Sequence, residues 1–176
     1  SNDFAIFQNL LESFLTDTLF WEQHTKDISI KLVCTSMGNE LLKRYLIKRD
    51  MQGIPLIPVY ERIILIGSDV SADSFKRNQG FDNLLEMTGS VLVLVNRRDG
   101  PLTLSQVMNL EGRLGKVGPI NRTNLPEQIV VRDVTKQIAW EDLPALGHDY
   151  FLRNQELRDY ILHVQLSQGL PENLGL

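Results

Sequence analysis

Cysteine is almost absent from this chain, because Cys34 is the only one among 176 residues. One cysteine forms no disulfide within a single chain, so a small disulfide-bonded scaffold is excluded. The chain has no apolar run of roughly 18 residues, so we expect no membrane span. It also lacks the basic segment and following apolar stretch of a secretory signal peptide. With these signals missing, we expect a cytoplasmic protein.

The chain has no excess of positive charge either. It carries 18 basic and 22 acidic residues, and its densest basic cluster is Lys43, Arg44, Lys48 and Arg49. This cluster has the extent of a short solvated helix face, whereas nucleic-acid binding needs a broad basic surface, so we expect no nucleic-acid partner. No Gly-rich phosphate loop follows the first expected strand, which argues against a nucleotide-binding domain. No residues have metal-ligand spacing, so we expect no metal and no other cofactor.

The chain does have an ordinary globular balance, with 43% hydrophobic and 23% charged residues. Apolar, β-branched segments alternate with segments of helical periodicity. The expected strands are 28–34, 62–67, 90–95 and 128–134. The expected helices are 3–25, 39–48, 71–77, 102–110 and 150–168, and the expected loops include 112–124 and 144–148. This alternation predicts an α/β fold with a mostly parallel sheet flanked by helices, in one domain over residues 1–176.

Three loops that follow these strands each carry a distinctive polar residue. Ser36 follows the first strand, Asp99 the third and His148 the fourth. Because parallel strands end at the same rim of a sheet, we expect the three side chains to gather there. A serine nucleophile needs a base to take its proton, and the base needs an acid to orient it. The three residues are therefore candidates for a catalytic triad.

Ser36 lies in Cys34-Thr35-Ser36-Met37-Gly38, on a sharp turn between an expected strand and an expected helix. Such a turn raises the hydroxyl above the sheet edge, and the free N–H groups of the helix face developing negative charge. The turn needs small neighbours, and its usual pattern is G-x-S-x-G. Gly38 keeps the second small position, whereas Cys34 replaces the first glycine. The Met37 amide is the candidate oxyanion-hole donor.

Each candidate also has a purely structural interpretation. Ser36 fits an ordinary strand–helix junction, His148 a surface loop, and Asp99 the tight turn that an Asp-Gly pair favours. Asp69 is a rival acid because it also follows a strand. For Asp69 we favour a role as the cap of the short helix expected at 71–77.

The segment VCTSMGNELL resembles the nucleophile turn of a group of bacterial α/β hydrolases of unknown function that carry H-S-M-G-N. Residues 63–75, 91–104 and 113–115 resemble further segments of the same group, and the similarity covers about 31–160. The resemblance implies an α/β-hydrolase fold with Ser36, Asp99 and His148 as its triad, by position. Thr35 stands where the family often has histidine, and Cys34 where small residues are usual.

The resemblance also reveals a gap before Ser36. Hydrolases of this fold take a second oxyanion-hole N–H from an early loop, and no such loop is recognisable upstream. We therefore expect the C-terminal part of a hydrolase domain, without its N-terminal strands. Either the natural protein is longer or the domain has lost this donor. An open strand edge would then pair with another copy of the chain or with a missing N-terminal region.

The sequence thus predicts a serine hydrolase of the esterase or acyl-ester class. Its substrate would be a small, ester-like molecule. The alternative is a catalytically degenerate hydrolase-like domain that serves as a binding or interaction module. Cys34 and the missing donor loop favour this alternative.

Overall fold

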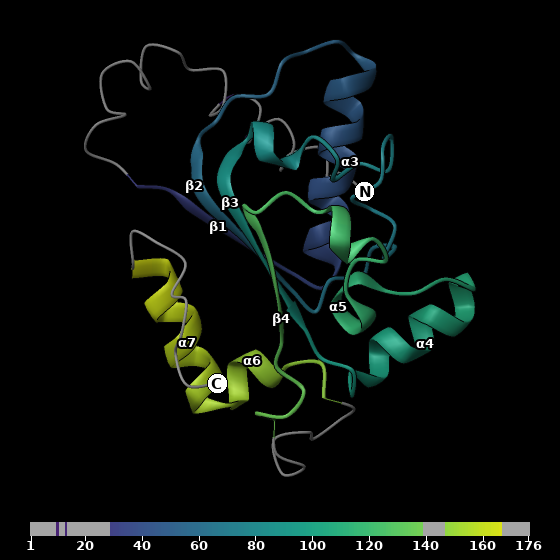
Figure 1. Ribbon diagram of the computed structural model, residues 1–176, viewed down its shortest axis with the longest axis vertical. Coiled ribbons are helices and arrows are strands. Elements are labelled where there is room, and N and C mark those ends of the chain that lie inside the picture. The colour runs from purple at the N-terminus through teal and green to yellow at the C-terminus, as the bar shows by residue number, and fades with distance from the viewer. Residues whose placement is uncertain (1–9, 11–12, 14–28, 139–146, 167–176) are drawn as a thin grey trace.

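The computed structural model of the protein describes residues 10, 13, 29–138 and 147–166. Its centre is a four-stranded sheet in the order β1-β2-β3-β4, in which every neighbouring pair is parallel (Figure 1). The strands are β1 (Lys31–Thr35), β2 (Tyr60–Ile66), β3 (Thr88–Val95) and β4 (Ile129–Asp133). The predicted parallel sheet flanked by helices is therefore confirmed.

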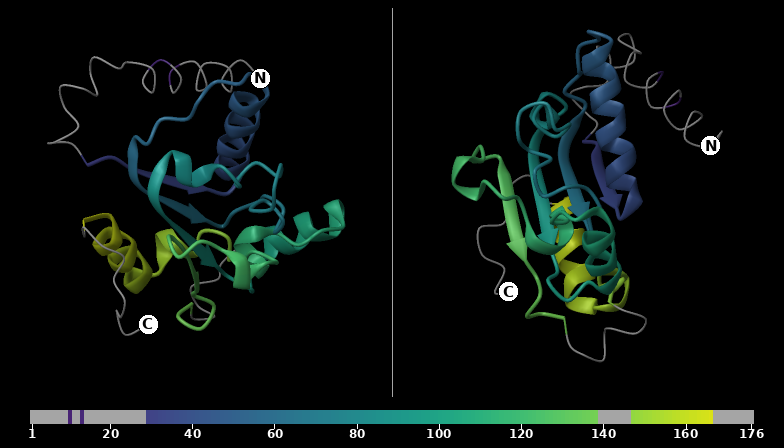
Figure 2. Two further views of the ribbon diagram at one scale, coloured as in Figure 1. Left: turned by 45° about the horizontal axis from the view of Figure 1, so that its top comes forward. Right: turned by 90° about the vertical axis from the view of Figure 1, so that its right-hand side faces the viewer.

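Helices cover both faces of this sheet. Figures 1 and 2 show α3, α4 and α5 on one side, and α6 and α7 on the other. The helices are α3 (Met37–Met51), α4 (Gly100–Asn109), α5 (Leu114–Val117), α6 (Tyr150–Arg153) and α7 (Gln155–Leu166), with short 3₁₀ helices η1 (Leu84–Glu86) and η2 (Arg122–Asn124). No helix in the described part of the chain is long and apolar enough to cross a membrane.

Alternate side chains of β2 and β3 point to opposite faces of the sheet and form two hydrophobic cores. One core joins the sheet to α3 and includes Ile63, Leu65, Val91, Val93, Leu42 and Leu46. The other joins it to α6 and α7 and includes Ile64, Ile66, Leu92, Leu94, Tyr150, Leu157 and Val164. Because both faces are covered, the carboxyl-terminal parts of the inner strands, residues 63–66 and 91–95, are apolar at every position, as buried parallel strands are.

Two loop regions differ from the prediction. Residues 71–77, expected as a short helix, form consecutive turns, and Ser71 makes an isolated β-bridge with Arg113. The segment 112–124, expected as a loop, contains α5 and η2. The cause is long-range backbone pairing, because the Leu114 amide donates to the Val70 carbonyl at 2.9 Å. Backbone groups that bond to a distant loop leave no local pattern in the sequence.

The final helix, expected over 150–168, is divided at Asn154. This residue has an extended ψ of 116°, and its Oδ1 accepts a hydrogen bond from the Leu157 amide at 2.9 Å, which caps α7. Residues 167–168 lie outside the described part of the chain. So do the helix expected at 3–25, apart from helical Leu10 and Ser13, and most of the loop expected at 144–148.

Candidate active site

Ser36 forms the turn between β1 and α3, at the carboxyl end of the strand. Its φ of 47° and ψ of −122° are rare for a residue other than glycine. Such a conformation costs about 1–3 kcal/mol and persists only where its surroundings hold it. The Ser36 amide donates to the Ile66 carbonyl at 3.0 Å, which fixes the turn to the end of β2.

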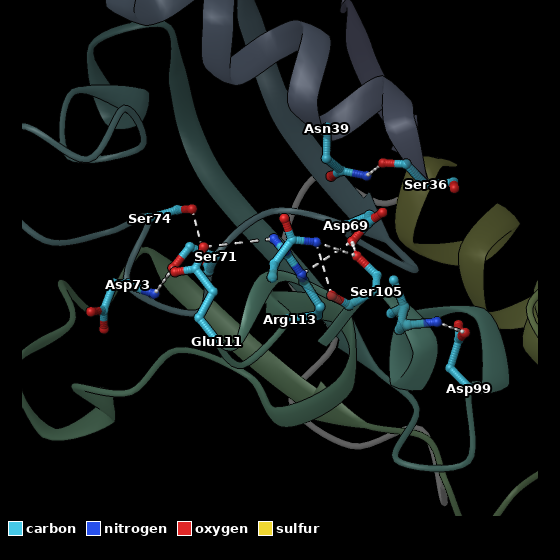
Figure 3. Close-up of polar contacts among 12 residues, drawn as sticks. Ser36, Asn39, Asp69, Ser71, Asp73, Ser74, Asp99, Ser105, Glu111 and Arg113 are labelled. Atoms are coloured by element: carbon cyan, nitrogen blue, oxygen red, sulfur yellow. Dashed lines mark hydrogen bonds and ion pairs between the residues drawn. The ribbon is translucent and has the colours of Figure 1, made fainter. Parts of the chain in front are cut away.

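Asn39, which sequence analysis missed, clamps the same turn from the first turn of α3. Its side chain is fully buried. Its Nδ2 donates toward the carbonyl oxygens of Cys34, Ser36 and Ile66 at 3.2, 3.0 and 3.3 Å, and Figure 3 shows the contact with Ser36. One amide group thus ties the turn to the ends of both β1 and β2. Asparagine is so common near turns that its presence there did not indicate this role.

The structure brings the three triad candidates together in a hydrogen-bonded chain. His148 Nε2 lies 2.8 Å from Ser36 Oγ, and His148 Nδ1 lies 2.8 Å from Asp99 Oδ2. A carboxylate only accepts hydrogen bonds, so Nδ1 carries the hydrogen and donates to Asp99. Nε2 is then the acceptor for the Ser36 hydroxyl. This is the arrangement in which an imidazole can remove a serine proton.

Asp99 is fully buried and has a second partner. Its Oδ1 accepts a hydrogen bond from the Leu102 amide at 2.9 Å, so the same carboxylate caps the N-terminus of α4 (Figure 3). The cap also explains why α4 begins at Gly100 and not at 102 as expected. One residue therefore both starts a helix and orients His148.

The electrostatic surroundings of His148 favour its protonated form. The hydrogen bond with Asp99 raises the pKa of His148, which burial of the ring lowers in part. The negative charges of Asp99, Asp149 and Asp69 raise this pKa further. The side chain is 24% exposed, so the ring is open on one side. A histidine of raised pKa is the stronger base for taking a proton from a hydroxyl.

Two further residues missed by sequence analysis position the His148 loop. Asn96 is fully buried, and its Nδ2 donates to the Gly147 carbonyl at 3.2 Å. The loop that carries Asp99 is thereby bonded to the residue that precedes His148. Gly67 follows β2, and a Cβ at this position would lie 3.3 Å from His148 Cε1. Asn96 directly follows a strand, as Ser36 does, and this position was the available signal.

The other residues of the predicted turn contribute less than their pattern indicated. Burial raises the pKa of the Cys34 thiol to about 12, so it stays protonated and is not a rival nucleophile. A Cβ at Gly38 would meet no described atom within 4 Å, so the described neighbours do not require glycine there. Met37 and Gly38 are the first two residues of α3, so their backbone N–H groups have no acceptor within the helix. Free amides at the N-terminus of a helix are the kind of group that can bind an anion.

Asp69 does not cap a helix, contrary to the prediction. Its Oδ1 accepts a hydrogen bond from Ser105 Oγ at 2.6 Å and lies 3.4 Å from Arg113 Nε (Figure 3). Asp99, and not this rival acid, is the carboxylate that is hydrogen-bonded to His148. Over the residues that the structure describes, no three His, Cys, Asp or Glu side chains gather into a metal site.

The model of a family described as "Alpha/beta hydrolase of unknown function (DUF900)" matches residues 7–165. This range includes all four strands of the sheet and the loops that carry Ser36, Asp99 and His148. A search of curated proteins and a search of solved structures gave no match.

Proposed function

The chain belongs to this family of α/β hydrolases, and on that premise we propose that it is a serine hydrolase acting on small, ester-like substrates. The observation that carries the proposal is the hydrogen-bonded chain from Ser36 through His148 to Asp99, with both contacts at 2.8 Å. Hydrolases of this fold have their triad in the chain order serine, acid, histidine, and place the serine on a strained strand-to-helix turn. The order of the three residues and the φ of Ser36 both support this function.

In the proposed reaction, Ser36 Oγ attacks the ester carbonyl carbon while His148 Nε2 takes the hydroxyl proton. Asp99 keeps the ring oriented and stabilises its positive charge. The oxyanion of the tetrahedral intermediate accepts a hydrogen bond from the Met37 amide, at the positive end of α3. The C–O bond to the alcohol then breaks, and His148 gives its proton to the departing oxygen. Ser36 is left as an acyl ester.

The second half of the reaction restores the serine. A water molecule attacks the acyl carbonyl carbon, and His148 Nε2 takes a proton from that water. When the bond to Ser36 Oγ breaks, His148 returns the proton to the serine, and the acid is released. No other side chain needs to change its protonation state.

Covalent labelling with a fluorophosphonate probe tests the proposal. The probe phosphonylates a serine only when a neighbouring base activates its hydroxyl. We expect the folded wild-type protein to be labelled and the Ser36→Ala variant to be unlabelled. A matched control is Ser29→Ala, because Ser29 is exposed and precedes the amino end of β1, away from Ser36. This variant should be labelled like the wild type.

Two results would contradict the proposal. Equal labelling of the wild type and Ser36→Ala would place the reactive group elsewhere. A folded wild type that takes up no probe would favour a binding module that has kept the geometry of a hydrolase without its activity.

A further inference from the structure

A cavity of about 330 Å³ adjoins the candidate active site, between the first turns of α3 and the helix α4. Met37, which follows Ser36 in the chain, lies on its α3 wall, and Asp69, Glu111 and Arg113 lie on the opposite wall. The volume is within the range of small-molecule sites, which are usually lined by apolar side chains. This lining is mostly charged, so a hydrocarbon chain would desolvate the charges without compensating them. The cavity therefore fits a polar group.

Asp69 links this cavity to the candidate triad. It follows β2, on the rim of the sheet that also carries Ser36 and His148. The hydrogen bond with Asp99 is the main cause of the raised pKa of His148. The negative charge of Asp69 also raises this pKa, by a smaller amount. A group bound at Asp69 would thus lie near the reacting atoms.

Half of the Asp69 carboxylate has no partner. Ser105 Oγ and Arg113 Nε both approach Oδ1, at 2.6 and 3.4 Å. No hydrogen-bond donor contacts Oδ2 in the described part of the chain, and the side chain is 23% exposed. Charge-assisted hydrogen bonds to a carboxylate are among the stronger polar contacts in proteins. The free oxygen is therefore suited to accept from a cationic donor.

Arg113 does not neutralise this wall of the cavity. Its side chain is 7% exposed, and its Nε is buried without a hydrogen bond of good geometry. It lies between two carboxylates, with Nε 3.4 Å from Asp69 Oδ1 and Nη1 3.9 Å from Glu111 Oε1 (Figure 3). Glu111 Oε2 is held in turn by Ser71 Oγ at 2.8 Å. Two carboxylates against one guanidinium give the wall a formal charge of −1.

The positive charge that balances this negative wall is on α3. Glu40 and Arg44 form an ion pair with each other at 2.8 Å, so the net positive charge of the α3 wall is that of Lys43. Lys43 is six positions beyond Met37, or nearly two helical turns. Lys43 thus lies nearly two helical turns from the end of α3 that Ser36 precedes, whereas Asp69 lies on the rim of the sheet that carries Ser36.

We propose that the wall formed by Asp69, Glu111 and Arg113 binds a positively charged group on the acyl part of the substrate. This inference rests on the proposed serine hydrolase. The substrate class is an ester whose acyl group carries an ammonium close to the reacting carbonyl, as in amino-acyl esters. The ammonium would donate to Asp69 Oδ2 while Ser36 attacks the carbonyl carbon.

Paired 4-nitrophenyl esters test this substrate class. In each pair an ammonium replaces a methyl group: 3-aminopropanoate against butanoate, and alanine against 2-methylpropanoate. The measured quantity is the ratio of kcat/KM within a pair, in the wild type and in Asp69→Asn. The asparagine oxygen can still accept the hydrogen bond from Ser105 Oγ. Any effect of Asp69 on His148 changes kcat/KM for both esters of a pair by the same factor, so it cancels in the ratio. We expect Asp69→Asn to lower the ratio about tenfold in at least one pair.

Two further measurements accompany this comparison. Asp159→Asn is the matched control, because it removes an exposed acid from α7 on the other face of the sheet, and its ratios should equal those of the wild type. The wild type alone gives an independent test that needs no folded variant. Its kcat/KM for the ammonium ester, relative to the uncharged ester of the pair, is divided by the same ratio of rate constants for hydrolysis by hydroxide, which corrects for intrinsic reactivity. The corrected ratio should be well above one.

The outcomes separate the two proposals. If all four esters are hydrolysed with dependence on Ser36 and Asp69→Asn leaves both ratios unchanged, the subsite is wrong and the hydrolase stands. A corrected wild-type ratio at or below one in both pairs also overturns the subsite alone. If Ser36→Ala hydrolyses every ester as the wild type does and the probe labels neither protein, both proposals fail.

Discussion

Ser36 holds a backbone conformation that most residues avoid, and a single buried amide, that of Asn39, donates to its carbonyl and to those of Cys34 and Ile66. His148 depends in the same way on neighbours that do no chemistry, because Asn96 is hydrogen-bonded to its loop and Gly67 leaves room for its ring. At the residue scale the candidate site therefore consists of three polar groups and the three residues that hold them or make room for them.

Asp99→Asn should lower kcat/KM by about three to four orders of magnitude, if Ser36 and His148 act as proposed. An amide can donate to Nδ1 and so hold the ring in the wrong tautomer, while the asparagine oxygen still caps α4. Asp99 raises the pKa of His148, so the acid limb of the wild-type pH profile should lie above that of an ordinary histidine. The limb should move to lower pH in the variant. A kcat/KM profile with the wild-type magnitude and midpoint would exclude this role for Asp99.

The same contact should make stability depend on pH. Because the folded pKa of His148 is raised, the contact stabilises the folded state below the unfolded pKa. This stabilisation is lost as the pH rises through the folded pKa. Urea unfolding should thus show a larger difference between wild type and Asp99→Asn at acidic pH than at alkaline pH.

At the scale of elements, the segment around α5 packs against the loop that follows β2. The Gly115 amide donates to the Ser68 carbonyl at 2.9 Å, and the Asn96 amide donates to the Gly115 carbonyl at 2.9 Å. Gly115 therefore joins the loops after β2 and β3. A Cβ at Gly115 would lie 2.2 Å from the Ser68 backbone nitrogen, so only glycine allows this approach.

Gly115→Ala should therefore lower the free energy of unfolding by about 1–3 kcal/mol, or more if the loops separate. The matched variant is Gly38→Ala, since a Cβ there meets nothing within 4 Å. Alanine in the first turn of α3 should be neutral or stabilise by about 0.5–1 kcal/mol. Urea unfolding of both variants measures the difference. Equal stability of the two would contradict the close contact between these loops.

All four strands, the parallel sheet and its flanking helices could be predicted from the sequence. Apolar runs and helical periodicity are local patterns, so each segment reveals its own structure. The prediction failed at 71–77 and 112–124, where the hydrogen bonds join loops about 40 residues apart, as in the bridge between Ser71 and Arg113. Asp69 was misread as a cap for the same reason. The gathering of Ser36, Asp99 and His148 was predicted because each follows a strand and parallel strands end at one rim of the sheet, whereas their catalytic roles stay predictions.

At the scale of the whole molecule, the sheet has two edge strands, β1 and β4, and β1 is the edge at which N-terminal strands would join. Over the described residues, β1 is hydrogen-bonded to β2 on one edge and to no strand on the other. An unpaired edge is a template for another strand. The predicted association, with a second copy or with a further N-terminal region, stays a prediction.

Sedimentation velocity and amide hydrogen exchange together test this association. We expect either a dimer that dissociates on dilution, or a monomer in which both edges of β1 are protected from exchange. In each case a further strand supplies hydrogen bonds to the open edge. A monomer at all concentrations, with rapid exchange along the outer edge of β1, would show that nothing pairs there.

The hydrogen bond between Ser36 and His148 spans 112 positions of the chain. Closing so long a segment costs entropy, and contacts of this kind form late and slowly when a protein folds. A nascent or partly unfolded chain would thus hold an inert serine until its last described helices dock. If Ser36 is the nucleophile as proposed, the onset of its reactivity during refolding would report that the two distant ends of this segment have met.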